Sequence, residues 1–300
     1  MARVRVVTDS AARFEDPHFA QDYDVVVVPI NIHFGDQVFR DGIDISAEEM
    51  FQRMRQDTLP PRPSAPPISA FESVYRELNK TTDQICVLTH SQHLTETFAH
   101  ARAARSGLLG RCEIAVIDSL TTSVGLGYLV EIIAEAASEG ADLEEIVRLA
   151  RATVPRIYSI YYVDTLDYIQ RAGLIGETQA ILGTMLDIKP ILTIEDGKLL
   201  TMEKARTHSQ AIDKMVEFAL EFTQIERLTI LQNTLRTTDR TRMLQDRLAL
   251  GFAKLQYPIL LYEPLIATLI GPDGMGMAIL EGEGDEESRP SEDDSEAEED

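Results

Sequence analysis

The chain has 300 residues and a formal net charge of −22, and 44% of its residues are hydrophobic. This length allows one large domain or two ordinary ones, and the apolar content is enough for a substantial core. No run of about 18 apolar residues occurs, so no membrane span is expected. The sequence has no basic stripe, and nucleic-acid binding therefore lacks its electrostatic footprint.

The first half of the sequence alternates strands and helices. Four short, continuous apolar runs predict strands that are covered on both faces, as in a parallel sheet: residues 4–8, 25–30, 85–89 and 113–118. Three pairs have the spacing of helix starts: Ser46 with Glu49, Ser69 with Glu72, and Asp142 with Glu145. These elements predict an N-terminal α/β domain with a parallel sheet over residues 1–157.

The second half has a different pattern. The stretch KPILTIEDGKLLTMEKART predicts a β-hairpin that turns at Asp196-Gly197, where glycine accepts a positive φ. Further strands are predicted at SIYYVDT, RLTILQN, PILLYEP and GMAILEG, and helices at about residues 209–222 and 240–250. This combination predicts a C-terminal α+β domain with a largely antiparallel sheet over residues 158–281.

The last twenty residues hold half of the net charge. Residues 281–300 include twelve acidic side chains and one arginine. A segment with so much charge and almost no apolar surface cannot bury a core, so residues 282–300 are expected to be a disordered acidic tail.

The amino terminus and the cysteines favour a cytoplasmic protein. MARVRVVTDS enters a strand directly, without the apolar core or the cleavage site of a secretory signal. Cys86 and Cys112 are the only cysteines and form no CxxC pair, so neither a zinc site nor a redox motif is expected. Two free thiols are typical of a reducing compartment.

Three strand-to-helix junctions in the first domain are rich in small hydroxyl residues. They lie at Thr8-Asp9-Ser10, in ICVLTHSQHLTETFAHA (residues 85–101) and in VIDSLTTSVGLGY (residues 116–128). Parallel strands end at one edge of their sheet, where helix N-termini offer free N–H groups that suit an anion. The alternative for each single junction is that Ser and Thr only cap helices.

The other candidate motifs are weaker. His90, His93 and His100 lie in or near a turn without a completing carboxylate pair, so solvated loop histidines are expected and no metal site. Residues 271–276 are rich in glycine but lack the Lys-Ser/Thr ending of a phosphate loop, which favours a simple turn. No GxSxG elbow occurs, and no catalytic residue can be nominated from this order alone.

Taken together in order, several stretches resemble the DegV family of bacterial lipid-binding proteins. The resemblance spans nearly all of residues 3–281 and rests on VVTDSAA, VVVVPINIHFGDQVFRDGIDISAEEM, PSAPPISAF, VIDSLTTSVGLGY, IKPILTIEDGKL with the following ART, and the Gly-rich last turn. It implies a carrier that encloses one long-chain fatty acid between its two domains and uses no other cofactor. It also implies a partner, because several members serve as the non-catalytic acyl-binding subunit of a fatty acid kinase.

The resemblance also implies which residues meet the lipid. Ser64, Thr95 and Arg206 match positions that the family uses near the carboxylate. Hydroxyl side chains of the strand-to-helix junctions supply a supporting polar rim: Ser91, Thr97 and Ser119.

Three positions depart from the family pattern at the polar end of this site. Pro63, Leu269 and Leu174 stand where the family has threonine, histidine and arginine. Pro63 offers neither a hydroxyl nor a backbone N–H. These departures leave the scaffold intact and alter the groups that would meet a head group or a kinase.

Two other functions remain open from the sequence. One is an enzyme that acts on a small anionic substrate at the sheet edge, with Asp9 or Asp118 as acid or base; its alternative is that both aspartates brace their turns. The other is a degenerate DegV-like scaffold without kinase coupling, which works through partners, with the acidic tail as one contact.

Overall fold

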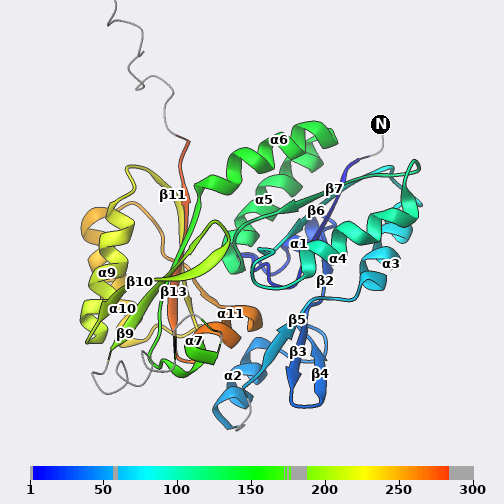
Figure 1. Cartoon of the computed structure of the whole chain (residues 1–300). Helices are drawn as coiled ribbons and strands as arrows, with labels where there is room; N and C mark the ends of the chain where they lie inside the picture. The colour runs from blue at the N-terminus through cyan, green and yellow to red at the C-terminus, as the bar shows by residue number, and fades with distance from the viewer. Residues whose placement is uncertain (1–2, 57–59, 172, 174–175, 177–187, 284–300) are drawn as a thin grey trace, which may run out of the picture.

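The structure is a computed structural model and describes residues 3–56, 60–171, 173, 176 and 188–283 (Figure 1). Within these residues the chain forms three sheets, of four, six and three strands. No helix in this described part is both long and apolar enough to cross a membrane. Most of the predicted acidic tail lies outside the described residues.

The four-stranded sheet carries the N-terminal half, and all its strand pairs are parallel, as predicted. Its strands, in spatial order, are β2 (Val26–Val28), β1 (Arg5–Asp9), β6 (Gln84–Thr89) and β7 (Glu113–Asp118). Alternate residues of β6 enter different apolar clusters: Ile85 and Val87 pack on one face, and Cys86 and Leu88 on the other. The strand is therefore covered on both faces, which explains its continuous apolar run.

Helices cover the two faces of this sheet. α3 (Ile68–Leu78) and α4 (Thr97–Ala104) lie on one face, followed by the short 3₁₀ helix η1 (Arg105–Leu108). α5 (Ser123–Glu139) and α6 (Leu143–Thr153) lie on the other, and α6 leads into the 3₁₀ turn η2 (Val154–Arg156). The remaining helices of this half are α1 (Phe19–Asp22) and α2 (Ala47–Gln56).

Two of the three predicted helix starts are confirmed. The Ser46 N–H donates to Glu49 Oε2 at 2.9 Å and the Glu49 N–H donates to Ser46 Oγ at 3.2 Å, which is a capping box before α2. Asp142 and Glu145 make the same pair of bonds before α6. The prediction at Ser69 was wrong, because Pro67 is the N-cap of α3 and the helix starts at Ile68. Proline has a φ of −64° there and needs no N–H, so Ser69 falls inside the first turn.

A small antiparallel sheet in the first half was not expected from the sequence. It consists of β4 (Gln37–Arg40), β3 (Asn31–Phe34) and β5 (Arg62–Ser64), in that order. The predicted strand 25–30 is shorter than expected, because β2 ends at Val28 and Pro29 cannot donate a ladder hydrogen bond. The chain turns between β3 and β4 at Gly35, where φ is +57°.

The six-stranded sheet carries the second half and is largely antiparallel, as predicted; only β11 and β12 pair in parallel. Its strands, in spatial order, are β10 (Lys198–Ala205), β9 (Lys189–Glu195), β8 (Ile157–Tyr162), β13 (Met275–Glu281), β11 (Ile225–Gln232) and β12 (Ile259–Leu261). The predicted β9–β10 hairpin is confirmed, and its turn residues Asp196 and Gly197 both have positive φ.

Helices α9 (His208–Leu220) and α10 (Asp239–Gly251) cover the outer face of this sheet, at the left of Figure 1. The short helices α7 (Asp167–Arg171) and α11 (Pro264–Ile270) contact each other below. The predicted strand PILLYEP is wrong in its second half, because Pro264 begins α11. Proline is favoured at the first position of a helix, where its missing N–H has no partner to lose.

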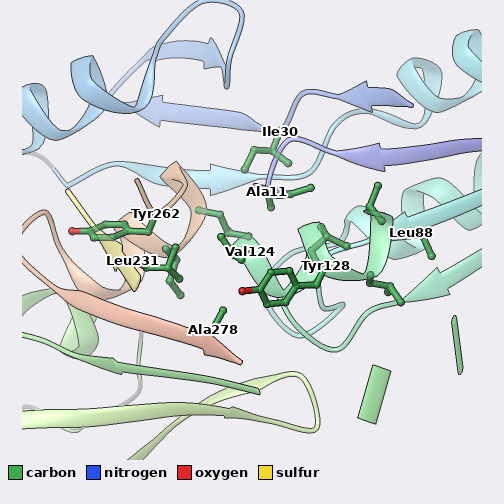
Figure 2. Packing of buried hydrophobic residues seen from close by; sticks show 14 of the residues in the cluster. Ala11, Ile30, Leu88, Val124, Tyr128, Leu231, Tyr262 and Ala278 are labelled. Atoms are coloured by element: carbon green, nitrogen blue, oxygen red, sulfur yellow. The ribbon is translucent and has the colours of Figure 1, made fainter. Parts of the chain in front are cut away.

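The two halves share one continuous apolar core along α5. The inner face of the six-stranded sheet packs against this helix, and Figure 2 shows Val124 and Tyr128 of α5 near Leu231 and Ala278 of that sheet. Two buried hydrogen bonds cross the same junction. The Thr122 hydroxyl donates to Glu263 Oε1 at 2.7 Å, and Tyr128 Oη lies 2.7 Å from Thr229 Oγ1. The junction is therefore apolar with a few paired polar groups.

Candidate functional site

The stretch ICVLTHSQHLTETFAHA forms the end of β6, a polar turn and α4, as expected. The turn lies at the carboxyl edge of the parallel sheet, beside Asp9 at the end of β1. Three of its polar side chains, His90, Ser91 and Thr97, are buried. A surface turn would leave such groups in water, so this turn is built into the protein interior.

A chain of polar contacts runs from Asp9 through His90 to Thr95. His90 Nδ1 lies 2.9 Å from Asp9 Oδ1, although the ring N–H points off the line to that oxygen. His90 Nε2 lies 2.7 Å from Thr95 Oγ1. The His90 ring and the Asp9 carboxylate are both fully buried. The prediction that His90 is a solvated loop histidine was therefore wrong, because the end of β6 places it under the turn.

Of the three residues in this series of polar contacts, only Thr95 is partly exposed. Its Oγ1 lies 2.7 Å from Thr97 Oγ1 and accepts the Thr97 N–H at 3.2 Å, at the start of α4. Thr95 is half-buried, whereas Thr97 is fully buried. Glu96, between them, is exposed. Thr95 and Thr97 therefore form one hydroxyl pair at the N-terminus of α4.

Ser91 joins this turn to the C-terminal sheet. Its hydroxyl donates to the Gly197 carbonyl, in the β9–β10 hairpin, at 2.7 Å and accepts the His93 N–H at 3.2 Å. A Cβ on Gly197 would lie 2.3 Å from Ser91 Oγ, so only glycine allows this approach. Ser91 is therefore a link between the two halves of the chain.

Asp118 and Ser119 brace the neighbouring junction after β7. Asp118 accepts the N–H groups of Leu120 at 3.1 Å and Gln92 at 3.2 Å. Burial raises the pKa of the Asp118 carboxyl, and these two backbone N–H groups oppose the rise. The Ser119 hydroxyl donates to the Thr121 carbonyl at 3.2 Å. Asp9 likewise accepts the N–H groups of Ala11 and His90. Both aspartates thus hold turns, as in the structural alternative to a catalytic role.

Ser64 lies at the end of β5, in the small antiparallel sheet. Its hydroxyl is 2.8 Å from Nε2 of His33, on the neighbouring strand β3. Two residues later, the Pro66 carbonyl contacts His100 Nδ1 of α4 at 2.7 Å. This contact places the residues that follow Ser64 beside α4. Thr97 is the first residue of this helix, and Thr95 lies just before it.

Arg206 lies elsewhere. It is exposed after the end of β10, and its N–H donates to Gln210 Oε1 at 3.0 Å. Gly197, which contacts Ser91, precedes the other end of this eight-residue strand, about 30 Å away at ~3.3 Å per residue. The structure therefore does not bring Arg206 to the hydroxyls around Ser91.

The three departures from the family pattern are partly visible. Pro63 and Leu269 line one pocket of about 470 Å³ between β5, α7 and α11, together with Arg62, Arg171 and Thr268, among others. Leu174 lies outside the described residues. The residues that replace the family threonine and histidine thus face the same space and make its wall more apolar.

Sequence reasoning missed the two histidines behind Ser64 and Thr95. His90 directly follows β6, and His33 alternates with apolar residues in the stretch NIHF. Such positions face the interior or a partner strand rather than solvent, and this was the available signal. In the described part of the chain, no group of three or more His, Cys, Asp or Glu side chains could hold a metal ion.

Comparison with known proteins agrees with this architecture. A family model described as "Uncharacterised protein, DegV family" matches residues 3–282. A DegV domain-containing protein of Caldanaerobacter subterraneus subsp. tengcongensis is 35% identical over 218 residues, which cover 73% of this chain and 77% of that protein.

Solved structures are similar over almost the whole length. The structure titled "Fatty Acid Binding of a DegV family Protein from Thermus thermophilus" has a TM-score of 0.79 at 26% identity and covers 93% of this chain and 100% of that chain. The fatty acid binding DegV family protein SAG1342 from Streptococcus agalactiae has the same fold, with a TM-score of 0.83 at 22% identity over 94% of this chain and 100% of that one. With the family model matching from residue 3 to residue 282, the chain belongs to the DegV family.

Proposed function

We propose that this chain binds one long-chain fatty acid and encloses its acyl chain between residues 1–157 and residues 158–281. The observation that carries the proposal is the whole-length likeness to the fatty-acid-binding DegV protein from Thermus thermophilus. The continuous apolar core along α5 supports it, because this junction supplies aliphatic side chains from both halves.

The energetics of an apolar junction fit such a ligand. A sixteen-carbon acid has about 14 methylene groups, and burying each contributes about 0.8 kcal/mol, or roughly 11 kcal/mol before the costs of association. The carboxylate must then find hydrogen-bond donors, because burying an unpaired charge costs far more than burying a few methylene groups contributes.

We assign the carboxylate to the hydroxyls of Ser64 and Thr95. Ser64 ends β5 and Thr95 lies two residues before α4, and both are half-buried, so each can face both the protein and a ligand. Ser91, Thr97 and Ser119 form the supporting rim. The hydroxyls of Ser91 and Ser119 already donate to backbone carbonyls, so these two position the turns instead of meeting the ligand.

Arg206 enters the proposal in a different role from Ser64 and Thr95. As an exposed cation far from Ser91, it attracts an anionic ligand or partner at long range instead of binding the carboxylate at Thr95. The pocket that Pro63 and Leu269 line is the proposed mouth, and Arg62 and Arg171 place two more cations there.

The proposal includes presentation of the carboxylate to a separate fatty acid kinase subunit, which would supply ATP and metal. The chain itself then acts as a carrier and not as a catalyst. Mixing the loaded protein with such a subunit, ATP and Mg²⁺ tests this step by the formation of acyl phosphate. Binding without phosphorylation would confine the function to carriage.

We further propose that the protein acts in the cytoplasm. Cys86 and Cys112 are both free, which is compatible with a reducing compartment. Fractionation of the producing cells tests this placement, and recovery of the protein outside the cytoplasm would contradict it.

Native mass spectrometry of the protein, purified from a bacterial host without detergent, tests the central proposal. We expect a mass increment that matches one fatty acid and that disappears after delipidation and returns with added palmitate. The Thr95→Val variant should bind the fatty acid with lower affinity. Absence of any acyl increment, together with no binding of added fatty acid, would refute the proposed function.

A further inference from the structure

The pocket between β5, α7 and α11 has a charge pattern that differs from the rest of the chain. Two arginines line it, Arg62 of β5 and Arg171 of α7, and none of the described residues in its lining is acidic. The whole chain has 50 acidic and 28 basic side chains. This pocket is therefore a local positive site on a strongly acidic protein.

Both arginines are available to a ligand. Their side chains are exposed, and within the described part of the chain neither forms an ion pair with an acidic side chain. Arg55 nearby differs, because it is paired with Asp273 at 2.8 Å. The guanidinium of Arg171 contacts the ring of Tyr168, with Cζ 5.7 Å from the ring centroid, which favours a side-chain position at the pocket.

The other described lining residues offer few hydrogen-bond donors. Leu269 is apolar, and the Thr268 hydroxyl already donates to the Leu265 carbonyl at 2.7 Å. The rest of the lining consists of residues without a backbone N–H: Pro60, Pro61 and Pro63. The side-chain donors that a ligand meets in this pocket are therefore the two guanidinium groups.

Two guanidinium groups match a phosphate better than a carboxylate. One guanidinium already satisfies both oxygens of a carboxylate in a bidentate pair. A phosphate monoester has three acceptor oxygens and carries about −1.5 to −2 charges at pH 7, so it accepts from both arginines. The pocket volume of about 470 Å³ lies within the range of small-molecule sites, ~300–1,000 Å³, and holds a head group larger than a carboxylate.

The spacing between Ser64 and Arg62 fits an ester-linked head group. These residues lie two positions apart on β5, so their side chains leave the same face of the strand about 7 Å apart. In a lysophosphatidate, six covalent bonds through the glycerol separate the acyl carbonyl carbon from the phosphorus. An acyl oxygen at Ser64 therefore leaves the phosphate within reach of Arg62.

We propose that Arg62 and Arg171 form a phosphate subsite, and that the protein takes single-chain lipids with a phosphate monoester, such as a lysophosphatidate, as well as fatty acids. The acyl chain occupies the apolar junction, the acyl oxygen lies at Ser64, and the phosphate binds the two arginines. This inference rests on the proposed function, because it uses the same acyl site.

The test compares lipids that differ in the phosphate alone. The full, delipidated chain is loaded with the fluorescent fatty acid cis-parinaric acid, which is then displaced by 1-palmitoyl lysophosphatidate, 1-monopalmitoylglycerol or palmitate below their critical micelle concentrations. We expect a Kd for lysophosphatidate at least about tenfold lower than that for monopalmitoylglycerol, because a hydrogen bond to a charged group contributes about that factor or more.

Single substitutions identify the subsite. Arg62→Gln and Arg171→Gln should each raise the Kd of lysophosphatidate about tenfold and change the Kd of monopalmitoylglycerol and of palmitate less than about threefold in 150 mM salt. Arg148→Gln is the matched control, because Arg148 is an exposed arginine of α6 outside this pocket, and it should leave all three values unchanged. Thermal unfolding checks that each variant is folded.

A second measurement reads the phosphate directly. The ³¹P resonance of lysophosphatidate should shift on binding to the wild type and should shift less with the double variant Arg62→Gln/Arg171→Gln. Equal Kd values for lysophosphatidate and monopalmitoylglycerol, or wild-type affinity for lysophosphatidate in both single variants, would overturn the inference while leaving fatty-acid binding intact. Binding of millimolar inorganic phosphate, without any preference for lysophosphatidate, would assign the arginines to free phosphate and overturn the lipid assignment. Failure of cis-parinaric acid and palmitate to bind would overturn the proposed function and this inference with it.

Discussion

Replacing Thr95 by valine tests the assigned carboxylate site most directly. Valine has nearly the same shape but no hydroxyl, so the change removes the hydrogen bond to the ligand and the contact with His90 Nε2. A hydrogen bond to a charged group contributes about 1.5–3 kcal/mol. Since ~1.4 kcal/mol is a factor of ten, we expect palmitate to bind roughly 10- to 100-fold more weakly.

The same change should also lower the stability of the protein. His90 is fully buried, and without Thr95 its Nε2 loses the partner that it has at 2.7 Å. Leaving a buried polar atom without a partner costs about 1–3 kcal/mol, so the free energy of unfolding should fall by that amount. Thr95→Ser keeps the hydroxyl and is the matched control.

Two assays read the two effects. Fluorescent fatty-acid titration at pH 7 gives Kd, and urea unfolding of the delipidated protein gives the stability change. Thr95→Ser should recover most of both losses. A folded Thr95→Val protein with wild-type affinity would refute the assignment of Thr95 to the carboxylate, whatever its stability.

Three further variants test other parts of the structure. Burial raises the pKa of Glu263, so the folded state holds this proton more tightly than the unfolded state and loses stability as the pH rises above the pKa of the unfolded state. Glu263→Gln should therefore be more stable than the wild type at pH 8, and thermal unfolding should show this gain shrinking toward pH 5. An equal gain at both pH values would contradict this. Gly127→Ala places a Cβ 1.9 Å from the Arg13 carbonyl oxygen and should cost about 3 kcal/mol or fail to fold, whereas Gly107→Ala, with open space around it, should unfold like the wild type. Arg206→Ala should change the Kd for palmitate by less than about twofold in 150 mM salt, because Arg206 is exposed and remote from Ser91; a loss as large as that of Thr95→Val would return Arg206 to the carboxylate.

Local signals in the sequence were sufficient for most of the fold. The apolar runs of β1, β6 and β7 indicated a parallel sheet, and the Asp196-Gly197 turn indicated the β9–β10 hairpin, because both signals depend on neighbours in the chain. The small sheet of β3, β4 and β5 was missed. Its strands are short, one begins after Pro29, and β5 joins it only through a long-range pairing with β3.

The candidate site was predicted in part. Thr95 and Thr97 were found from their place before and at the start of a helix, and the structure puts them in contact. His90 was misjudged, since a histidine in a turn is usually solvated, and nothing local indicates that Asp9, 81 residues away, closes over it. The sequence match of Arg206 likewise carries no information on its distance from Thr95 in space.

The sequence by itself determined most strands of the two larger sheets, two of the three predicted helix starts and the hydroxyl-rich junctions, since each depends on side chains a few residues apart. Only the tertiary structure decided which of those groups meet: Asp9 with His90, His33 with Ser64, and Ser91 with Gly197. These contacts join separate strands and both halves of the chain, so their distances follow from how the sheets pack and not from any local pattern. The contacts of the Thr95 hydroxyl with His90 and Thr97 depend on this packing.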